Sequence, residues 1–138
     1  MLERHKMRIK QTNLVVVAGI LLYAVPVYAH HSFAAEFDAG KPITLRGSIT
    51  RLEMTNPHGW LYINVTEEDG SVQNWAVETG APRALMRAGG NRESLAPGTE
   101  IIVEGWLARN GTPTVNGRNI MFADGRSITT GSSIPEIP

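Results

Sequence analysis

Residues 55–80 read TNPHGWLYINVTEEDGSVQNWAVETG, and this stretch decides the fold of the 138-residue chain. Two runs within it, 60–65 and 72–78, are rich in the aromatic and β-branched residues that strands favour. The Asp-Gly pair at 69–70 between them is a strong hairpin signal. We therefore predict two antiparallel strands, preceded by a turn at 55–59, where Asn, Pro and Gly cluster.

Three further strands and one short helix are predicted on either side of this hairpin. Upstream, residues with apolar and polar side chains alternate from 41 to 51, as in a half-buried strand. Downstream, residues 81–88 carry a proline at 82, suited to the first turn of a helix, and end at the Gly-Gly pair 89–90, which is typical of a helix end. Two β-rich runs follow, at 100–107 and 115–122, with an Asn-Gly turn between them.

This order of elements predicts a mainly β fold: a small five-stranded barrel like that of the oligonucleotide/oligosaccharide-binding (OB) fold, with one short helix between strands three and four. Other small open barrels or a split sandwich would show the same order, because order alone does not fix strand pairing. We expect this single domain to span residues 30–126. A flexible C-terminal tail rich in Thr, Ser, Gly and Pro is expected at 127–138.

The first 29 residues have the layout of a secretory signal peptide. Four basic side chains precede an apolar run at 14–25, and residues 27–29 offer a cleavage site after Ala29. The run is shorter than the roughly 20 apolar residues of a membrane-spanning helix, and Pro26 interrupts it. We expect a periplasmic or secreted protein with no stable membrane span after the leader is cleaved. Retention of the leader as an uncleaved anchor is the alternative.

Composition and motifs argue against several classes of function. The chain has no cysteine, which excludes disulfides, thiolate metal sites and thiol catalysis. The expected mature chain keeps 9 basic and 12 acidic residues, and Lys41 is its only lysine, so no nucleic-acid partner is expected. Neither a Gly-x-Ser-x-Gly elbow nor a phosphate-binding glycine motif occurs. The acidic run 67–69 is interpreted as solvated, and Glu53 and Glu78 as solvent-facing strand residues, which makes an enzyme the less favoured interpretation.

Four segments together carry a resemblance to a known family. They are HHSFAAEFD at 30–38, TNPHGW at 55–60, NWAVETG at 74–80 and ALMRAG at 84–89. On these motifs the chain resembles a family of small exported bacterial proteins known only as a domain of unknown function. The resemblance covers nearly all of residues 30–126. It implies export and a small β domain, and it implies no particular activity.

Three histidines remain after the expected cleavage, namely His30, His31 and His58. His30 would then offer a terminal amine as well as an imidazole, and the two could chelate one metal ion while His58 adds a further nitrogen. Nitrogen ligands suit Cu(II), which also stands at the top of the divalent affinity series. The amine, with a pKa near ~7.7–8.0, is partly deprotonated at neutral pH, so a metal ion displaces its proton easily. Copper is therefore the expected cofactor, with weaker candidate ligands at Glu36, Asp38 and Met54.

Two other interpretations stay open. The paired histidines can be a solvated stretch beside the cleavage site, and His58 can simply hydrogen-bond within its turn. A stacking face on the barrel is also possible from its aromatic residues, Trp60, Trp75, Trp106 and Tyr62. The expected function is an exported periplasmic copper-binding protein, a carrier or buffer. The alternative is a non-metal binding module whose barrel face recognises a periplasmic protein or a small cell-envelope ligand.

Overall fold

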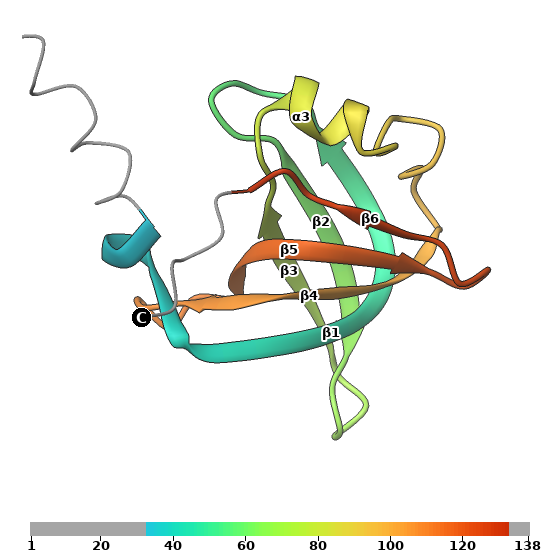
Figure 1. Ribbon diagram of the computed structural model, residues 1–138. Helices are drawn as coiled ribbons and strands as arrows, with labels where there is room; N and C mark the ends of the chain where they lie inside the picture. Colours follow the sequence, from blue (N-terminus) through green and yellow to red (C-terminus); the bar gives the residue numbers. More distant parts are fainter. Residues whose placement is uncertain (1–32, 133–138) are drawn as a thin grey trace, which may run out of the picture. The chain divides into compact units, whose positions relative to one another are not determined.

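The computed structural model of the protein describes residues 33–132. This part of the chain is mainly β, as Figure 1 shows. Its elements in chain order are β1 (Phe37–Glu53), β2 (Trp60–Thr66), β3 (Val72–Glu78), α3 (Pro82–Arg87), β4 (Glu100–Ala108), β5 (Thr114–Phe122) and β6 (Ser127–Thr129). The predicted order of three strands, a short helix and two strands is confirmed, and β6 is an additional strand.

Five of the strands pair in a ring. The order across the sheet is β3-β2-β1-β4-β5-β6, and β3 also pairs with β5. That last pairing is parallel, whereas every other pairing in the sheet is antiparallel. The long strand β1 joins the two sides of the ring, because its first part pairs with β4 and its last part with β2. It begins four residues before the predicted start at Lys41.

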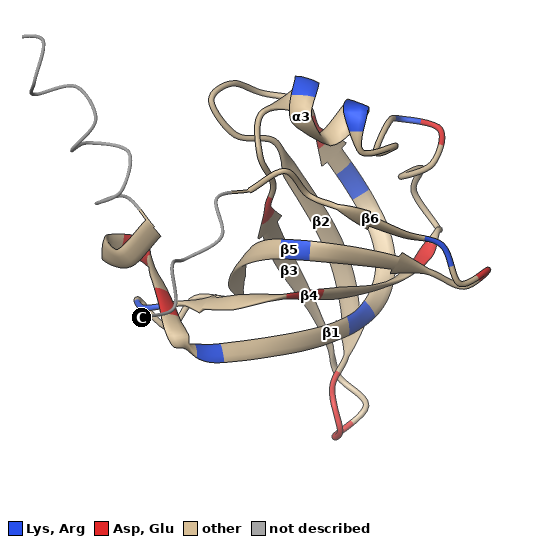
Figure 2. Cartoon of the chain, viewed as in Figure 1, with Lys and Arg blue, Asp and Glu red and all other residues tan. Residues whose placement is uncertain are grey.

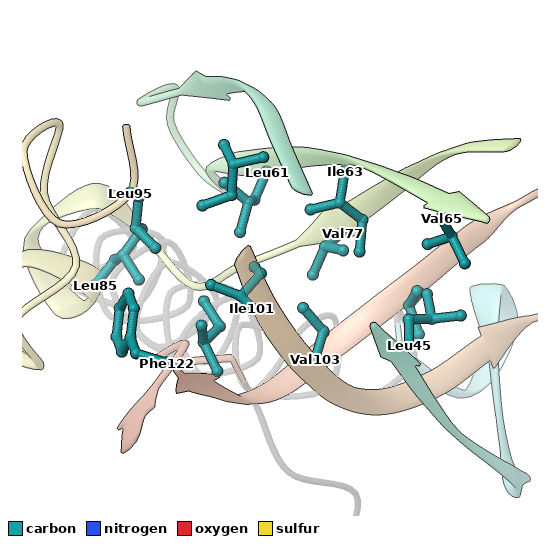
Figure 3. Packing of buried hydrophobic residues seen from close by; sticks show 13 residues of the cluster. Leu45, Leu61, Ile63, Val65, Val77, Leu85, Leu95, Ile101, Val103 and Phe122 are labelled. Atoms are coloured by element: carbon teal, nitrogen blue, oxygen red, sulfur yellow. The ribbon is translucent and has the colours of Figure 1, made fainter. Parts of the chain in front are cut away.

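The core lies inside this ring. Residues Leu61, Ile63 and Val65 alternate along β2 with more exposed neighbours, so one face of the strand points inward. Figure 3 shows these side chains facing Val77, Val103 and Leu45 from other strands, which together bury one continuous apolar cluster. Most of the fold's stability comes from removing this apolar surface from water.

The short helix α3 closes one end of the ring. Its Leu85 is fully buried, as is Leu95 in the turn that follows, and both lie beside Phe122 in Figure 3. Pro82 occupies the first turn of the helix, as predicted. Gly89 ends the helix with φ of +101°, a left-handed conformation that glycine adopts without strain. The helix boundaries predicted from these punctuating residues are thus confirmed to within a residue.

The hairpin at the centre of the sequence also forms as predicted. The amide of Glu67 donates to the carbonyl of Ser71 at 2.8 Å, and Gly70 has φ of +84°. Every residue of β2 is paired in register with a residue of β3. This turn is acidic and lies at the end of the domain opposite α3, as Figures 1 and 2 show.

The predicted C-terminal tail is wrong for residues 127–132. Residues Ser127–Thr129 pair with β5 as β6, and the next residue, Thr130, is fully buried. The Thr130 hydroxyl donates to the carbonyl of Gly117 at 2.6 Å, and its own carbonyl accepts from the amide of Gly80 at 3.0 Å. In the sequence, the small and hydroxyl-bearing residues of this segment are typical of a solvated tail. In the structure, their small side chains allow the backbone to lie close to the neighbouring chain. Residues 133–138 lie outside the described part.

Candidate functional site

One row of side chains crosses the outer face of the ring. In this row Trp60 is the partner of Glu78, Glu78 of Asn116 and Asn116 of Trp106, on strands β2, β3, β5 and β4. The preceding residues on β3 and β5 are core residues, so alternation turns Glu78 and Asn116 away from the core. We call these four residues the outer-face row.

Glu78 is a carboxyl group almost cut off from water. Its side chain is only 9% exposed, although it was interpreted from sequence as solvent-facing. Burial raises the pKa of Glu78, because the charged form is poorly solvated there. The nearby charge of His58 and a hydrogen bond from Asn116 oppose this effect, whereas the charge of Glu36 adds to it. The solvent-facing interpretation fails because the strand's outer face is covered at this point.

His58 contacts the carboxyl group of Glu78. Its ring Nδ1 lies 3.1 Å from Glu78 Oε1 and 3.2 Å from the carbonyl oxygen of Thr79. A carbonyl oxygen can only accept, so the contact with Thr79 assigns the hydrogen to Nδ1. In the neutral ring Nε2 then carries the lone pair, and the His58 side chain is 42% exposed.

The turn that carries His58 is fixed from both sides. Within it the Asn56–Pro57 peptide is cis, and the Thr55 hydroxyl donates to the carbonyl of His58 at 2.8 Å. Gly59 then pairs with the chain leaving β3, because its amide donates to the Gly80 carbonyl at 3.1 Å and its carbonyl accepts from the Thr79 amide at 2.9 Å. These bonds extend the β2–β3 ladder and hold the imidazole over Glu78.

Asn116 is a polar residue that the sequence analysis missed. It is 4% exposed, and its Nδ2 donates to Glu78 Oε1 at 3.4 Å. Its Oδ1 is buried and has no hydrogen-bond partner within residues 33–132. Glu78 and Asn116 lie on two different predicted strands, and only the pairing of β3 with β5 brings them together, so no local sequence signal identifies this pair.

The chain that enters β1 packs at the other end of the outer-face row. Residues 33–36 are helical, and the Phe33 ring meets Trp106 edge to face at a centroid distance of 5.6 Å. Arg109 fixes this turn, because its Nε donates to the carbonyl of Ala34 and its amide to that of Glu36, both at 2.8 Å. The exposed Glu36 is close enough for its charge to raise the pKa of Glu78.

The predicted metal ligands are therefore only partly described. His30 and His31 lie outside the described residues. Asp38 is bound to the amide of Gly40 and lies near Lys41 and Arg109, while Met54 packs against the core. Between residues 33 and 132, no three or more His, Asp or Glu side chains are grouped to hold a metal ion. Of the predicted ligands that the structure describes, His58 and Glu36 are the two found near Glu78.

The four aromatic residues predicted to share a face are divided between surfaces. Trp60 and Tyr62 lie on the outer face, where the Arg51 guanidinium stands 4.1 Å from the Tyr62 ring centre. Trp75 is opposite Ile63 and packs against the core, and its Nε1 donates to Glu67 at 3.4 Å. Trp106 is 6% exposed. Of the four rings, Trp60 and Tyr62 are therefore the two that the outer face leaves partly exposed.

Comparison with known proteins yields a family without an assigned activity. A family model matches residues 17–117, and its description is a family of unknown function, DUF6152. No curated protein and no solved structure matches the chain significantly. Across the described residues, no helix has the length and apolar character needed to cross a membrane.

Proposed function

The chain belongs to the DUF6152 family of unknown function, so its role must be argued from its site, and we propose that it is an exported periplasmic protein that binds Cu(II). The ligands would be His58 Nε2 together with His30, its terminal amine and His31, after cleavage of the leader following Ala29. The role of such a site is to carry or buffer the metal ion.

One observation carries the proposal: Glu78 and the Thr79 carbonyl both hold His58 through Nδ1. Histidines that bind metals usually donate the second ring nitrogen to a carboxylate or a carbonyl, which fixes the tautomer and makes the ligating nitrogen more basic. His58 has both kinds of partner, and its ring is partly exposed.

The proposed site requires one ion to take nitrogen ligands from both the terminus and the turn. Consecutive Cα atoms are about 3.8 Å apart, so the Cα of His30 stays within about 11 Å of that of Phe33. Phe33 contacts Trp106, which stands two strand spacings, roughly 10 Å, from Glu78 along the outer-face row.

The donor set favours copper over harder cations. Amine and imidazole nitrogens suit Cu(II), whereas calcium and magnesium require several oxygen ligands. Glu36 could add one oxygen ligand or orient an imidazole, because its charge already acts on Glu78. Asp38 is less available, since Gly40, Lys41 and Arg109 surround its carboxylate.

The test compares three forms of the exported protein recovered from the periplasm. Mass and amino-terminal sequence first establish whether the chain begins at His30. Cu(II) is then titrated, in competition with a chelator, into the native form, into a form whose terminal amine is acetylated, and into His58→Ala. We expect one ion per native chain and a loss of affinity of at least about tenfold in each altered form, since each removes one nitrogen ligand.

Two results would overturn the proposal. One is equal copper affinity in all three forms, and the other is the absence of binding to a native chain that begins at His30. Thermal unfolding of the metal-free proteins is the control, because removing the half-exposed His58 ring should leave the domain folded. A failure would favour the non-metal alternative, in which Trp60 and Tyr62 on the outer face contact a protein or a small ligand.

A further inference from the structure

A groove beside α3 is lined by residues other than His58 and Glu78. It has a volume of about 580 Å³ and is lined by Met54, Pro82, Met86, Asn91, Arg92 and Glu93. Its apolar wall is unusual for this surface, because Met86 is 50% exposed, and Val72 is the other large hydrophobic residue of the described chain with comparable exposure. A volume of this size lies within the range of small-ligand sites, roughly 300–1,000 Å³.

Arg92 lines the groove, and two further exposed arginines lie on the adjoining helix α3. Three exposed arginines, Arg83, Arg87 and Arg92, fall within ten residues of sequence, as the blue segments on and after α3 in Figure 2 show. In the described chain no carboxylate lies within 4.0 Å of their guanidinium groups. Glu93 is the one acidic residue that lines the groove. The acidic β2–β3 turn lies at the opposite end of the domain.

From this arrangement we propose that the groove binds a free single-chain amphipathic anion, an alkyl chain with a carboxylate head group. The alkyl chain would contact Met54, Pro82 and Met86, which bury apolar surface without requiring a rigid shape because methionine side chains adapt. The carboxylate would pair with Arg92, whose planar guanidinium suits two-point hydrogen bonding to a carboxylate. Arg83 and Arg87 would add attraction at longer range.

The combination of groove and charge favours a free molecule over a bilayer. A bilayer presents anionic head groups but keeps its acyl chains inside, so it would contact the arginines and leave the groove empty. A free amphiphile satisfies both features at once, because its tail leaves water in the groove while its head remains beside Arg92.

The experiment is calorimetric titration of the full protein with dodecanoate below its micellar concentration, in the presence of a metal chelator. Dodecyltrimethylammonium has the same chain with the opposite charge, and acetate has the head group alone. We expect saturable one-to-one binding of dodecanoate and none of the other two. Arg92→Gln and Met86→Gln should each weaken dodecanoate binding by about tenfold, since each removes one of the two recognition elements.

Matched controls are Arg118→Gln and Val72→Gln, which alter an exposed arginine and the other exposed hydrophobic residue away from the groove. Both should bind dodecanoate like the unaltered protein. Absence of dodecanoate binding, equal binding of the cationic amphiphile, or equal losses in the controls would each overturn the proposal. Cosedimentation with phosphatidylglycerol vesicles that depends on Arg92 but not on Met86 would overturn it in favour of a membrane surface. Because no metal is present, the result is independent of the copper proposal.

Discussion

Replacing Glu78 with glutamine separates the positioning role of this residue from its effect on stability. Glutamine has the same shape and retains an oxygen that can accept from His58 Nδ1, now 3.1 Å from the carboxylate. It carries no charge, so it is a weaker acceptor and holds the ring less firmly. Changes to residues that orient metal ligands typically lower metal affinity by about 10–100-fold, and we expect a loss in that range for copper.

The stability of the same variant should change in the opposite direction at neutral pH. Because burial raises the pKa of Glu78, the folded protein holds this proton more tightly than the unfolded chain does. The stabilising contribution of Glu78 is therefore complete below its ordinary pKa of 4.5 and is lost as the pH rises through the raised folded value. Glu78→Gln lacks this loss, so its free energy of unfolding should increasingly exceed that of the unaltered protein as the pH rises from 4.5 to the raised pKa of the folded state.

Urea unfolding followed by tryptophan fluorescence measures the stability difference at several pH values, and chelator competition measures copper affinity. At pH 4 the two proteins should agree within about 1 kcal/mol, the net worth of one neutral hydrogen bond. Glu100→Gln, at an exposed carboxylate on β4, is the control and should change neither quantity. A stability difference that does not vary with pH would refute the argument from burial. Unchanged copper affinity in Glu78→Gln would refute the positioning role.

Three further predictions concern the packing that supports the site. Leu85→Ala removes a fully buried side chain of α3 and leaves a cavity, so it should lower the free energy of unfolding by about 2–5 kcal/mol. A loss below about 1 kcal/mol in urea unfolding would contradict this prediction. Gly80→Ala should lower the free energy of unfolding by about 1–3 kcal/mol in the same assay, because the added Cβ would collide with the backbone of Gly131. An unchanged urea midpoint would show that the backbone at Gly131 shifts to make room for it. Thr130→Val keeps the shape but removes the hydrogen bond to the Gly117 carbonyl, so thermal unfolding should show a loss of about 1–3 kcal/mol, and equal stability would mean that water replaces the donor.

Much of the fold was predictable because its signals are local. The Asp-Gly turn, the proline that begins α3 and the glycine that ends it each act on a few neighbouring residues, and all three behave as predicted. The strand at 60–65 was likewise predicted, from its aromatic and β-branched residues. The C-terminal strand was missed because Ser127–Thr129 carries little apolar character, and its stability comes from pairing with β5.

The candidate site was less predictable, because its geometry depends on contacts between distant residues. The sequence by itself singled out His58 through the scarcity of histidine, and it determined the hairpin that places this residue before β2. Only the tertiary structure decided that Glu78 lies behind the imidazole and that Asn116 lies beside Glu78, since the first contact joins residues 20 positions apart and the second 38. Alternation assigns a residue to one face of a strand, but whether that face meets water depends on what the rest of the chain lays over it. The burial that raises the pKa of Glu78 is therefore a property of the folded ring and not of the residues around it in sequence.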